Sequence, residues 1–560
     1  MTAPLIGSLA YVLVTTGRMI LREPQRVPFW DQWLFVLPEQ YLGNLFAQHN
    51  EHRIPLARIV FALDTYLFSG AGRLSQGAVF SCLLLTAALL ARSVRRAARS
   101  RLGALQVFAF GTTALFSAYS WENLVWTFQF SFVSVFPAAV GAFLAVARPA
   151  GGRGSLLLAA GCAALATYSG ASGIFVAPLL IVLAVLAGRP RSHAIAMAGV
   201  TAALLIAYLA GYERPPRHAD PMATIRDPAL WARYLVVYLG APLSARCAEH
   251  TGILSAVFGG AGLTAWAVTC VHAVARRRRR DPAAWVPVCT MTFIVGTAFL
   301  TALGRSNFGV AQASSSRYGT PSFVFWSSLF AYGMLSTERL RARLGVVALA
   351  SVVAVGIASE QQAHEDTARA YLLGRTQDAE TALLSGGLDV AAVDRVAAAP
   401  WRVERSLPEL RRRHLSVFSQ PWAQWLHWPL SRFVSERNDA ACLGSIDVAR
   451  PVPAYGAPAF RFEGWVSARD AGASPERIVV IDSRGRVIGF ATAGRPRPDV
   501  PKAFPYIQEP RVGFVGHVGR LKRRQEAVQL VAIMGDGRTA CHFGASITLD
   551  RATAQALVRP

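Results

Sequence analysis

Residues 283–303 read AAWVPVCTMTFIVGTAFLTAL, a run of 21 residues without a charged side chain. About 20 apolar residues in a helix cross the ~30 Å hydrocarbon core of a bilayer, so this run predicts a membrane-spanning helix. Five consecutive arginines, Arg276 to Arg280, precede the run, and Gly304-Arg305 follows it. Apolar segments that alternate with arginine clusters are the pattern that decides the fold of the first two thirds of the chain.

The same pattern recurs throughout the first 358 residues. Hydrophobic residues make up 53% of the 560-residue chain and charged residues only 16%, with a mean hydropathy of +0.34, which excludes an ordinary soluble protein of this size. The composition predicts an α-helical polytopic membrane protein with about eleven transmembrane helices. Besides 283–303, the uncharged segments are 4–17, 74–91, 103–120, 128–147, 155–169, 173–188, 194–211, 251–272, 321–335 and 345–358.

The arginine clusters predict the orientation of the chain, because short cytoplasmic loops are enriched in basic residues. All clusters fall on one side if residues 54–70 do not cross the bilayer. Arg58 and Asp64 lie in that segment, and each charge at mid-bilayer costs about 2.5–3.5 kcal/mol. We therefore expect 54–70 to be an amphipathic helix at the outer interface, in a bacterial inner-membrane protein with a cytoplasmic N-terminus and a periplasmic C-terminus. The clusters lie at 92–101, 148–153, 189–191, 276–280 and 339–343.

After residue 358 the composition changes and a different architecture is expected. Residues 359–434 predict an extracytoplasmic helical connector. From residue 435 to 560, short runs rich in Val, Ile and Phe alternate with turn residues, which predicts an extracytoplasmic β-sandwich. Cys442 and Cys541 bracket this domain and are a possible disulfide in an oxidising periplasm, although no spacing rule requires it. The transmembrane domain is then 1–358, with an outer loop at 22–73.

The loops expected on the outer side hold most of the polar motifs, whereas the inner loops hold little except arginine. No clear span has an ionisable residue near its middle, which disfavours an ion-coupled transporter. The net charge of +24 is explained by the inner loops and does not indicate nucleic-acid binding. The outer motifs are Trp30-Asp31-Gln32-Trp33, His49-Asn50-Glu51-His52-Arg53, Trp121-Glu122-Asn123, a long loop at 212–250, and the loop from Gly304-Arg305 to Arg317-Tyr318.

These features together resemble the GT-C class of integral membrane glycosyltransferases. Within the membrane portion, about residues 1–360, the shared features are an acid in the first outer loop, interfacial helices and about eleven spans. The extracytoplasmic β-domain that follows is a further shared feature. The His-Asn-Glu-His-Arg, Trp-Glu-Asn and Ser-Arg-Tyr elements also look like those of a poorly characterised bacterial branch. The resemblance implies a sugar donor carried on polyprenyl phosphate and inversion of the anomeric configuration. GT-C enzymes often carry an acid pair in the first loop, whereas Asp31 has Gln32 beside it.

Such an enzyme needs a base, because an acceptor hydroxyl is a poor nucleophile at neutral pH. Asp31 is the candidate catalytic base. Trp30 and Trp33 would shield its carboxylate and stack on a sugar or acceptor. The structural alternative is that both tryptophans belong to an interfacial aromatic belt and that Asp31 caps a helix.

The leaving lipid phosphate needs positive charge, and arginine binds two phosphate oxygens with its planar fork. Arg305 and Arg317 are the candidate lipid-phosphate ligands, and Tyr318 would add a hydrogen bond. The alternative is that both arginines pair with lipid headgroups.

His49, Glu51 and His52 are expected to orient the base or the sugar through hydrogen bonds. The alternatives are pairing with Arg53 and a divalent metal site, since His and Glu also bind zinc. Glu122 and Asn123 are candidates for binding sugar hydroxyls. Pairing of Glu122 with an arginine and a capped helix end are the alternatives. No cofactor is firmly expected, and no metal residues are assigned.

The sequence therefore predicts a glycosyltransferase that decorates a cell-envelope glycan or glycolipid on the outer face of the membrane. Its partners are the polyprenyl-phosphate sugar, the acceptor and the lipid bilayer, without nucleic acid. A flippase or transporter of lipid-linked saccharides is the alternative from another class, and a glycan polymerase is a third interpretation.

Overall fold

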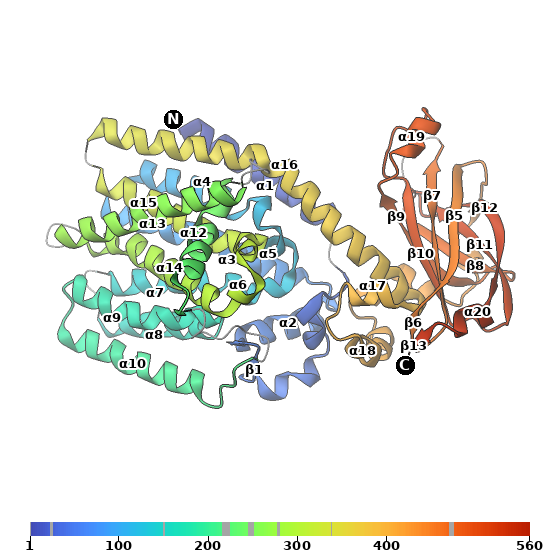
Figure 1. Ribbon diagram of the computed structural model, residues 1–560, viewed down its shortest axis with the longest axis horizontal. Coiled ribbons are helices and arrows are strands. Elements are labelled where there is room, and N and C mark those ends of the chain that lie inside the picture. Colours follow the sequence, from blue (N-terminus) through green and yellow to red (C-terminus); the bar gives the residue numbers. More distant parts are fainter. Residues whose placement is uncertain are drawn as a thin grey trace. The chain divides into compact units, whose positions relative to one another are not determined.

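The computed structural model describes residues 2–22, 26–148, 152–215, 225–244, 251–276, 281–337, 339–469, 475 and 477–559. The chain forms two compact units. The first comprises Met1–Pro24, Leu42–Val60 and Leu74–Ala368, and the second comprises Gln25–Tyr41, Phe61–Arg73 and Arg369–Pro560. Figure 1 shows that the first unit is built from helices and that the long strands belong to the second.

The helices of the first unit establish a multi-pass membrane protein. Within the described residues, seven helices are long and apolar enough to cross a bilayer, or eight if a pair bent by 43° counts as one span. The sequence predicted eleven spans; two of the predicted segments form shorter apolar helices, Arg153–Thr167 and Ala171–Leu186. The seven are Thr2–Leu21, Arg73–Ala97, Thr127–Val146, Arg191–Leu209, Gly252–Ala275, Pro282–Phe308 and Leu340–Ser385, and the bent pair is Arg101–Leu115 with Ala118–Val125.

Large apolar side chains on the outer surfaces of these helices are exposed. Ile206 on α10 (Arg191–Leu209) and Val271 on α13 (Thr251–Ala275) are each 72% exposed, and Val352 on α16 (Leu340–Ser385) is 70% exposed. Such a surface matches lipid chains better than water. The other helices are α1 (Thr2–Arg22), α3 (Arg73–Ala97), α4 (Arg101–Leu115), α5 (Trp121–Val125), α6 (Phe130–Val133), α7 (Val135–Val146), α8 (Arg153–Thr167), α9 (Val176–Leu186), α14 (Trp285–Arg305) and α15 (Gly319–Ser336).

The expected outer loop 212–250 contains a helix that the sequence analysis missed, α12 (Pro228–Ser244). It packs on α13 with backbones in close contact: a Cβ at Gly240 would lie 1.9 Å from the Ser255 carbonyl oxygen, and a Cβ at Gly259 would lie 1.8 Å from that of Val236. Only glycine fits at both positions. The remainder of the loop at 216–224 and 245–250 lies outside the described residues.

The segment 54–70 contains the expected helix, α2 (Pro55–Phe68), but its charges point inward. Arg58 is buried and donates to the Ala47 carbonyl oxygen at 2.8 Å, while Asp64 is buried and accepts from the Gly72 N–H at 2.7 Å. The exposed positions are apolar, as expected for a helix in contact with lipid. They are Ile59, Leu63, Tyr66, Leu67 and Phe68.

The second unit contains an eight-stranded sheet that is antiparallel except for one edge pair. Its order is β4-β12-β11-β8-β9-β10-β7-β5, and β4 pairs with β12 in parallel. Two antiparallel hairpins belong to this sheet, with β8 paired to β9 and β11 paired to β12. The strands are β4 (Glu436–Arg437), β5 (Cys442–Val452), β7 (Ala459–Ala468), β8 (Arg477–Asp482), β9 (Val487–Arg495), β10 (Gly513–Gly519), β11 (Gln525–Ile533) and β12 (Thr539–Asp550).

A smaller sheet and short helices complete the second unit. The small sheet has the order β13-β6-β3, with strands β13 (Val558–Arg559), β6 (Ala454–Tyr455) and β3 (Leu388–Asp389). Before the large sheet come α17 (Val390–Asp394) and α18 (Pro400–Arg412).

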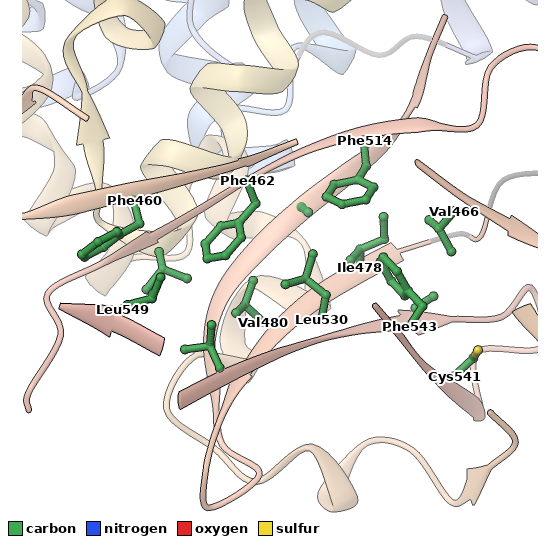
Figure 2. Packing of buried hydrophobic residues seen from close by; sticks show 14 of the residues in the cluster. Phe460, Phe462, Val466, Ile478, Val480, Phe514, Leu530, Cys541, Phe543 and Leu549 are labelled. Carbon is green, nitrogen blue, oxygen red and sulfur yellow. The ribbon is translucent and has the colours of Figure 1, made fainter. Parts of the chain in front are cut away.

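The large sheet curls around one apolar core. Figure 2 shows Phe460, Phe462, Phe514 and Phe543 gathered in this core, and the rings of Phe514 and Phe543 meet edge to face at 5.6 Å. A disulfide joins Cys442 on β5 to Cys541 on β12, with Cα atoms 6.1 Å apart, so strands from opposite sides of the sheet order lie together. The strands form one hydrogen-bonded sheet, and the two separate sheets of a sandwich are not established.

Candidate functional site

A two-residue hairpin presents Glu51 in the first unit. Strands β1 (Gln48–His49) and β2 (His52–Arg53) pair antiparallel, with His49 opposite His52, so Asn50 and Glu51 form the turn. Asn50 has a φ of +50°, a conformation that asparagine adopts more readily than most residues. The sequence His-Asn-Glu-His therefore places one carboxylate at the tip of a tight turn.

The hairpin is fixed to the C-terminal end of α10. The Arg53 guanidinium donates to the Tyr208 carbonyl oxygen at 2.8 Å, and the Tyr208 hydroxyl donates to the Glu51 carbonyl oxygen at 2.6 Å. The last carbonyl groups of a helix lack intrahelical partners and carry partial negative charge, so an arginine is favoured there. Arg53 therefore anchors the hairpin to the end of α10.

Glu51 lies between one predicted phosphate ligand and one predicted hydrogen-bonding histidine. The Arg305 Nη2 donates to Glu51 Oε1 at 2.9 Å, and His52 Nε2 is 3.4 Å from the same oxygen. The Ala171 N–H donates to His52 Nδ1 at 2.9 Å, which assigns the ring proton to Nε2, facing the carboxylate. The contact between Arg305 and Glu51 joins residues that are 254 positions apart in sequence.

A second carboxylate holds the other predicted phosphate ligand. Glu122 Oε1 is 3.7 Å from Arg317 Nη2, and Glu122 Oε2 accepts from the Ser316 hydroxyl at 2.6 Å and the Arg317 N–H at 3.1 Å. The Asn123 amide donates to the Arg317 carbonyl oxygen and to Thr320 Oγ1, both at 2.8 Å. Glu122 and Asn123 thus fix the turn that leads into α15.

Two polar atoms of this turn remain unsatisfied among the described residues. Arg317 Nε and Asn123 Oδ1 are buried without a hydrogen-bond partner there. An unpaired buried polar group costs about 1–3 kcal/mol, so natural proteins retain few of them. These atoms mark the turn as a place where a polar ligand would be stabilised.

Tyr318 connects the two arginines. Burial raises the pKa of its phenol, whereas the nearby Arg317 and Arg305 guanidiniums favour the ionised form. Its ring lies 5.0 Å from that of Tyr238, and the Arg317 guanidinium is 6.0 Å from the Tyr318 ring centre. The structure therefore brings Arg305, Arg317 and Tyr318 into one cluster, with Glu51 beside it.

Helix α12 supports the tyrosines of this cluster. Pro242 lacks an N–H, which leaves the Tyr238 carbonyl without its helical donor. The Ser322 hydroxyl of α15 donates to this oxygen at 2.6 Å, and Trp326 Nε1 donates to the neighbouring Leu239 carbonyl at 2.9 Å. Pro242 thus leaves the Tyr238 carbonyl free to accept a hydrogen bond from α15 beside Tyr318.

His49 occupies a different environment from His52. It is buried, and its ring packs edge to face on Phe128 at 5.5 Å, whereas His52 packs on Phe132 at 5.2 Å. Within the described residues, no group of three or more His, Cys, Asp or Glu side chains could hold a metal ion.

The predicted base lies in the second unit. Asp31 is in the first turn of the short helix Trp30–Phe35. Trp33 is buried and its indole N–H donates to the Val396 carbonyl at 3.1 Å, whereas Trp30 is 40% exposed and has a φ of +49°. Trp33 therefore packs inside the second unit. Trp30 is the tryptophan of the two whose side chain is exposed.

Tyr208, Tyr238 and Ser316 belong to the cluster but were not predicted from the sequence. Tyr208 lies near the C-terminal end of the uncharged segment 194–211, which is a position that sequence can identify. Its partner Glu51 is 157 positions away, and no local pattern reveals that contact.

No protein-family model matches the chain, and no curated protein or solved structure matches it either. The arguments for function therefore depend on the geometry of the site and on its physical chemistry.

Proposed function

We propose that this protein is a membrane glycosyltransferase of the GT-C type. It moves a sugar from polyprenyl phosphate to a cell-envelope glycan or glycolipid on the outer face of the membrane, with inversion. The observation that carries the proposal is the cluster of Arg305, Arg317 and Tyr318 beside Glu51, at the end of the apolar helix α14. A lipid-linked phosphate needs cationic ligands at such a membrane-adjacent position.

In this proposal the two arginines balance the charge that develops on the leaving phosphate. A guanidinium has five N–H donors, so the contact of Arg305 with Glu51 leaves donors for phosphate oxygens. Glu51 and Glu122 hold the two arginines in place before the donor arrives. Tyr318 donates a hydrogen bond to the same phosphate.

Asp31 takes the proton of the acceptor hydroxyl, and Glu51 is a positioning residue for Arg305. Asp31 holds this role by the resemblance to GT-C enzymes, whereas the role of Glu51 is supported by its 2.9 Å contact with Arg305. The remaining features belong to the same proposal: eleven spans, a bacterial inner membrane and a periplasmic β-domain with a sandwich fold. The Cys442–Cys541 disulfide supports an oxidising compartment for that domain.

The test is sugar transfer by purified protein in nanodiscs, with a panel of radiolabelled polyprenyl-phosphate sugars and an envelope extract. Arg305→Ala should lower the rate about 100-fold, because it removes charge stabilisation of the leaving group. Asp31→Asn should abolish transfer in a folded protein. Arg339→Ala is the matched control, since Arg339 is exposed and lies in a predicted inner loop.

The outcomes separate the assignments. If Asp31→Asn retains wild-type transfer while Glu51→Gln loses it, Glu51 replaces Asp31 as the base. If wild-type protein transfers no sugar from any donor but moves labelled lipid-linked saccharide across liposomes, the transporter alternative replaces the enzyme.

A further inference from the structure

The second unit contains a cavity of about 500 Å³ that the proposed function does not use. Its apolar wall includes Val390, Val452 and Pro453. The charged residues of its lining are four arginines and two carboxylates: Arg395, Arg450, Arg461, Arg559, Asp389 and Glu463.

The fold brings these arginines together from separate elements. Arg450 on β5 lies directly opposite Arg461 on β7, so both side chains share one face of the sheet. Arg559 comes from β13, and Arg395 follows α17. Like charges directly opposite in a sheet are destabilising, so this arrangement requires compensation by anions.

Carboxylates compensate the inner part of the cavity. Arg461 is 8% exposed; its Nε donates to Glu463 at 2.6 Å, and its Nη1 lies 3.1 Å from Asp378 and 3.4 Å from Asp389. Arg395 Nη1 also pairs with Asp378, at 3.1 Å. These contacts form the floor of the cavity, in which Asp378, Asp389 and Arg461 are buried, Glu463 is half-buried and Arg395 is exposed.

Hydrogen bonds fix the Asp389 carboxylate of this floor. His517 Nε2 lies 3.1 Å from Asp389 Oδ2, and the Ala391 N–H donates to Asp389 Oδ1 at 2.9 Å. The other ring nitrogen of His517 contacts the Thr381 hydroxyl at 2.7 Å. A side chain held in this way offers a rigid surface to a ligand.

Arg450 and Arg559 supply positive charge that this network does not neutralise. Both are exposed at the rim of the cavity, and no ion pair or hydrogen bond joins either guanidinium to another described residue. The three carboxylates of the floor are already engaged with other arginines. An oxyanion with two oxygens is the group that two free guanidinium forks recognise.

We propose that this cavity binds the phosphate or carboxylate group of a small organic ligand. The volume of about 500 Å³ fits a molecule of monosaccharide size, because ligand pockets commonly measure about 300–1,000 Å³. Arg450 and Arg559 bind the oxyanion, and the apolar wall contacts the rest of the ligand. The site is separate from the Arg305 cluster and does not depend on the proposed transferase activity.

The test is calorimetric titration of the full-length protein in detergent with inorganic phosphate, glucose 6-phosphate, glucuronate and uncharged glucose. We expect saturable binding of at least one anion and none of glucose. The double variant Arg450→Ala/Arg559→Ala should weaken anion binding at least about tenfold, since it removes both charge-assisted contacts. The affinities for glucose 6-phosphate and glucuronate distinguish a phosphate site from a carboxylate site.

The matched control is Arg484→Ala/Arg538→Ala, which removes the same charge from exposed arginines in the β8–β9 and β11–β12 turns, outside the cavity. This control should bind the anion as wild type does, and thermal unfolding should show that both double variants are folded. The proposal is overturned if no anion binds wild-type protein, or if both double variants weaken binding equally.

Discussion

The two units place their apolar and polar groups in opposite ways. Side chains such as Ile206 and Val271 lie outermost in the first unit, where partly buried polar residues form the Arg305 cluster. In the second unit Phe462 and Leu530 lie in the core, and exposed arginines such as Arg450 surround it. The opposite placement of apolar side chains indicates that each unit is adapted to a different solvent, lipid for the first unit and water for the second.

The largest expected effect is confined to the second unit. Cys442→Ser should destabilise it by about 4–5 kcal/mol, because the disulfide closes a loop with a sequence separation of 99 residues. Limited proteolysis in membranes should then cleave residues 435–560 while the helices of the first unit stay protected. Cys162→Ser is the control, since Cys162 is a free cysteine of α8. Equal loss of protection from proteolysis in both units would contradict the prediction that the effect is confined to the second unit.

Replacing one leucine by alanine in each unit compares the stability contributed by a core side chain with that of an exposed apolar side chain. Leu530→Ala should cost about 3 kcal/mol, because the residue is fully buried in the sheet core. Leu209→Ala on α10 should change stability by less than about 0.5 kcal/mol, since this side chain is 56% exposed. Thermal unfolding of each variant in the same detergent measures both changes. Similar costs would show that Leu209 packs against protein rather than lipid.

A pH effect is expected from the buried ions of the second unit. Burial opposes ionisation of Asp389, but the His517 hydrogen bond and the charges of His517 and Arg461 outweigh it and lower the pKa of Asp389. The ionised carboxylate therefore stabilises the fold above the unfolded pKa of about 3.9, and this stability is lost as pH falls through the lower folded pKa.

The substitution Asp389→Asn should cost about 2 kcal/mol at pH 7 by removing hydrogen bonds to a charged group. The cost should shrink as the pH falls below about 4, because the unfolded wild-type chain then binds a proton at Asp389 that the folded carboxylate, with its lowered pKa, does not bind. Chemical unfolding at several pH values measures it. If the loss of stability caused by Asp389→Asn stays constant at every acidic pH tested, the ionised form of Asp389 is not the source of that stability.

The smallest effect concerns the turn that presents Glu51. Asn50→Ala should destabilise the first unit by about 1 kcal/mol, because alanine is strained at a φ of +50°. Asn50→Gly is the matched control and should be tolerated. The difference between their melting temperatures is the readout, and equal values would indicate that the hairpin relaxes without cost.

Much of the helical architecture could be predicted from sequence, because uncharged segments such as 283–303 and 194–211 need no long-range information. Helix α12 could not be predicted in this way. Arg233 and Pro242 interrupt its apolar pattern, and its stability comes from backbone contact of Gly240 with α13. Tertiary packing therefore overrides the local signal there.

The candidate site shows the same limit. The sequence identified Glu51, Arg305, Glu122 and Arg317 as separate motifs because polar residues stand out beside apolar segments. It could not pair Glu51 with Arg305, since their contact depends on how distant helices pack. The disulfide was expected only as one possibility. The arginine cavity of the second unit was not foreseen because its residues come from five separate elements.

The Cys442–Cys541 link also has a mechanical consequence. Under tension between the membrane helices and the C-terminus, the residues enclosed by the disulfide cannot be extended. Their sequence separation of 99 residues corresponds to roughly 330 Å of contour length that remains locked. A pulling experiment should release this length only after reduction, so the β-domain would transmit force to the membrane portion rather than unravel.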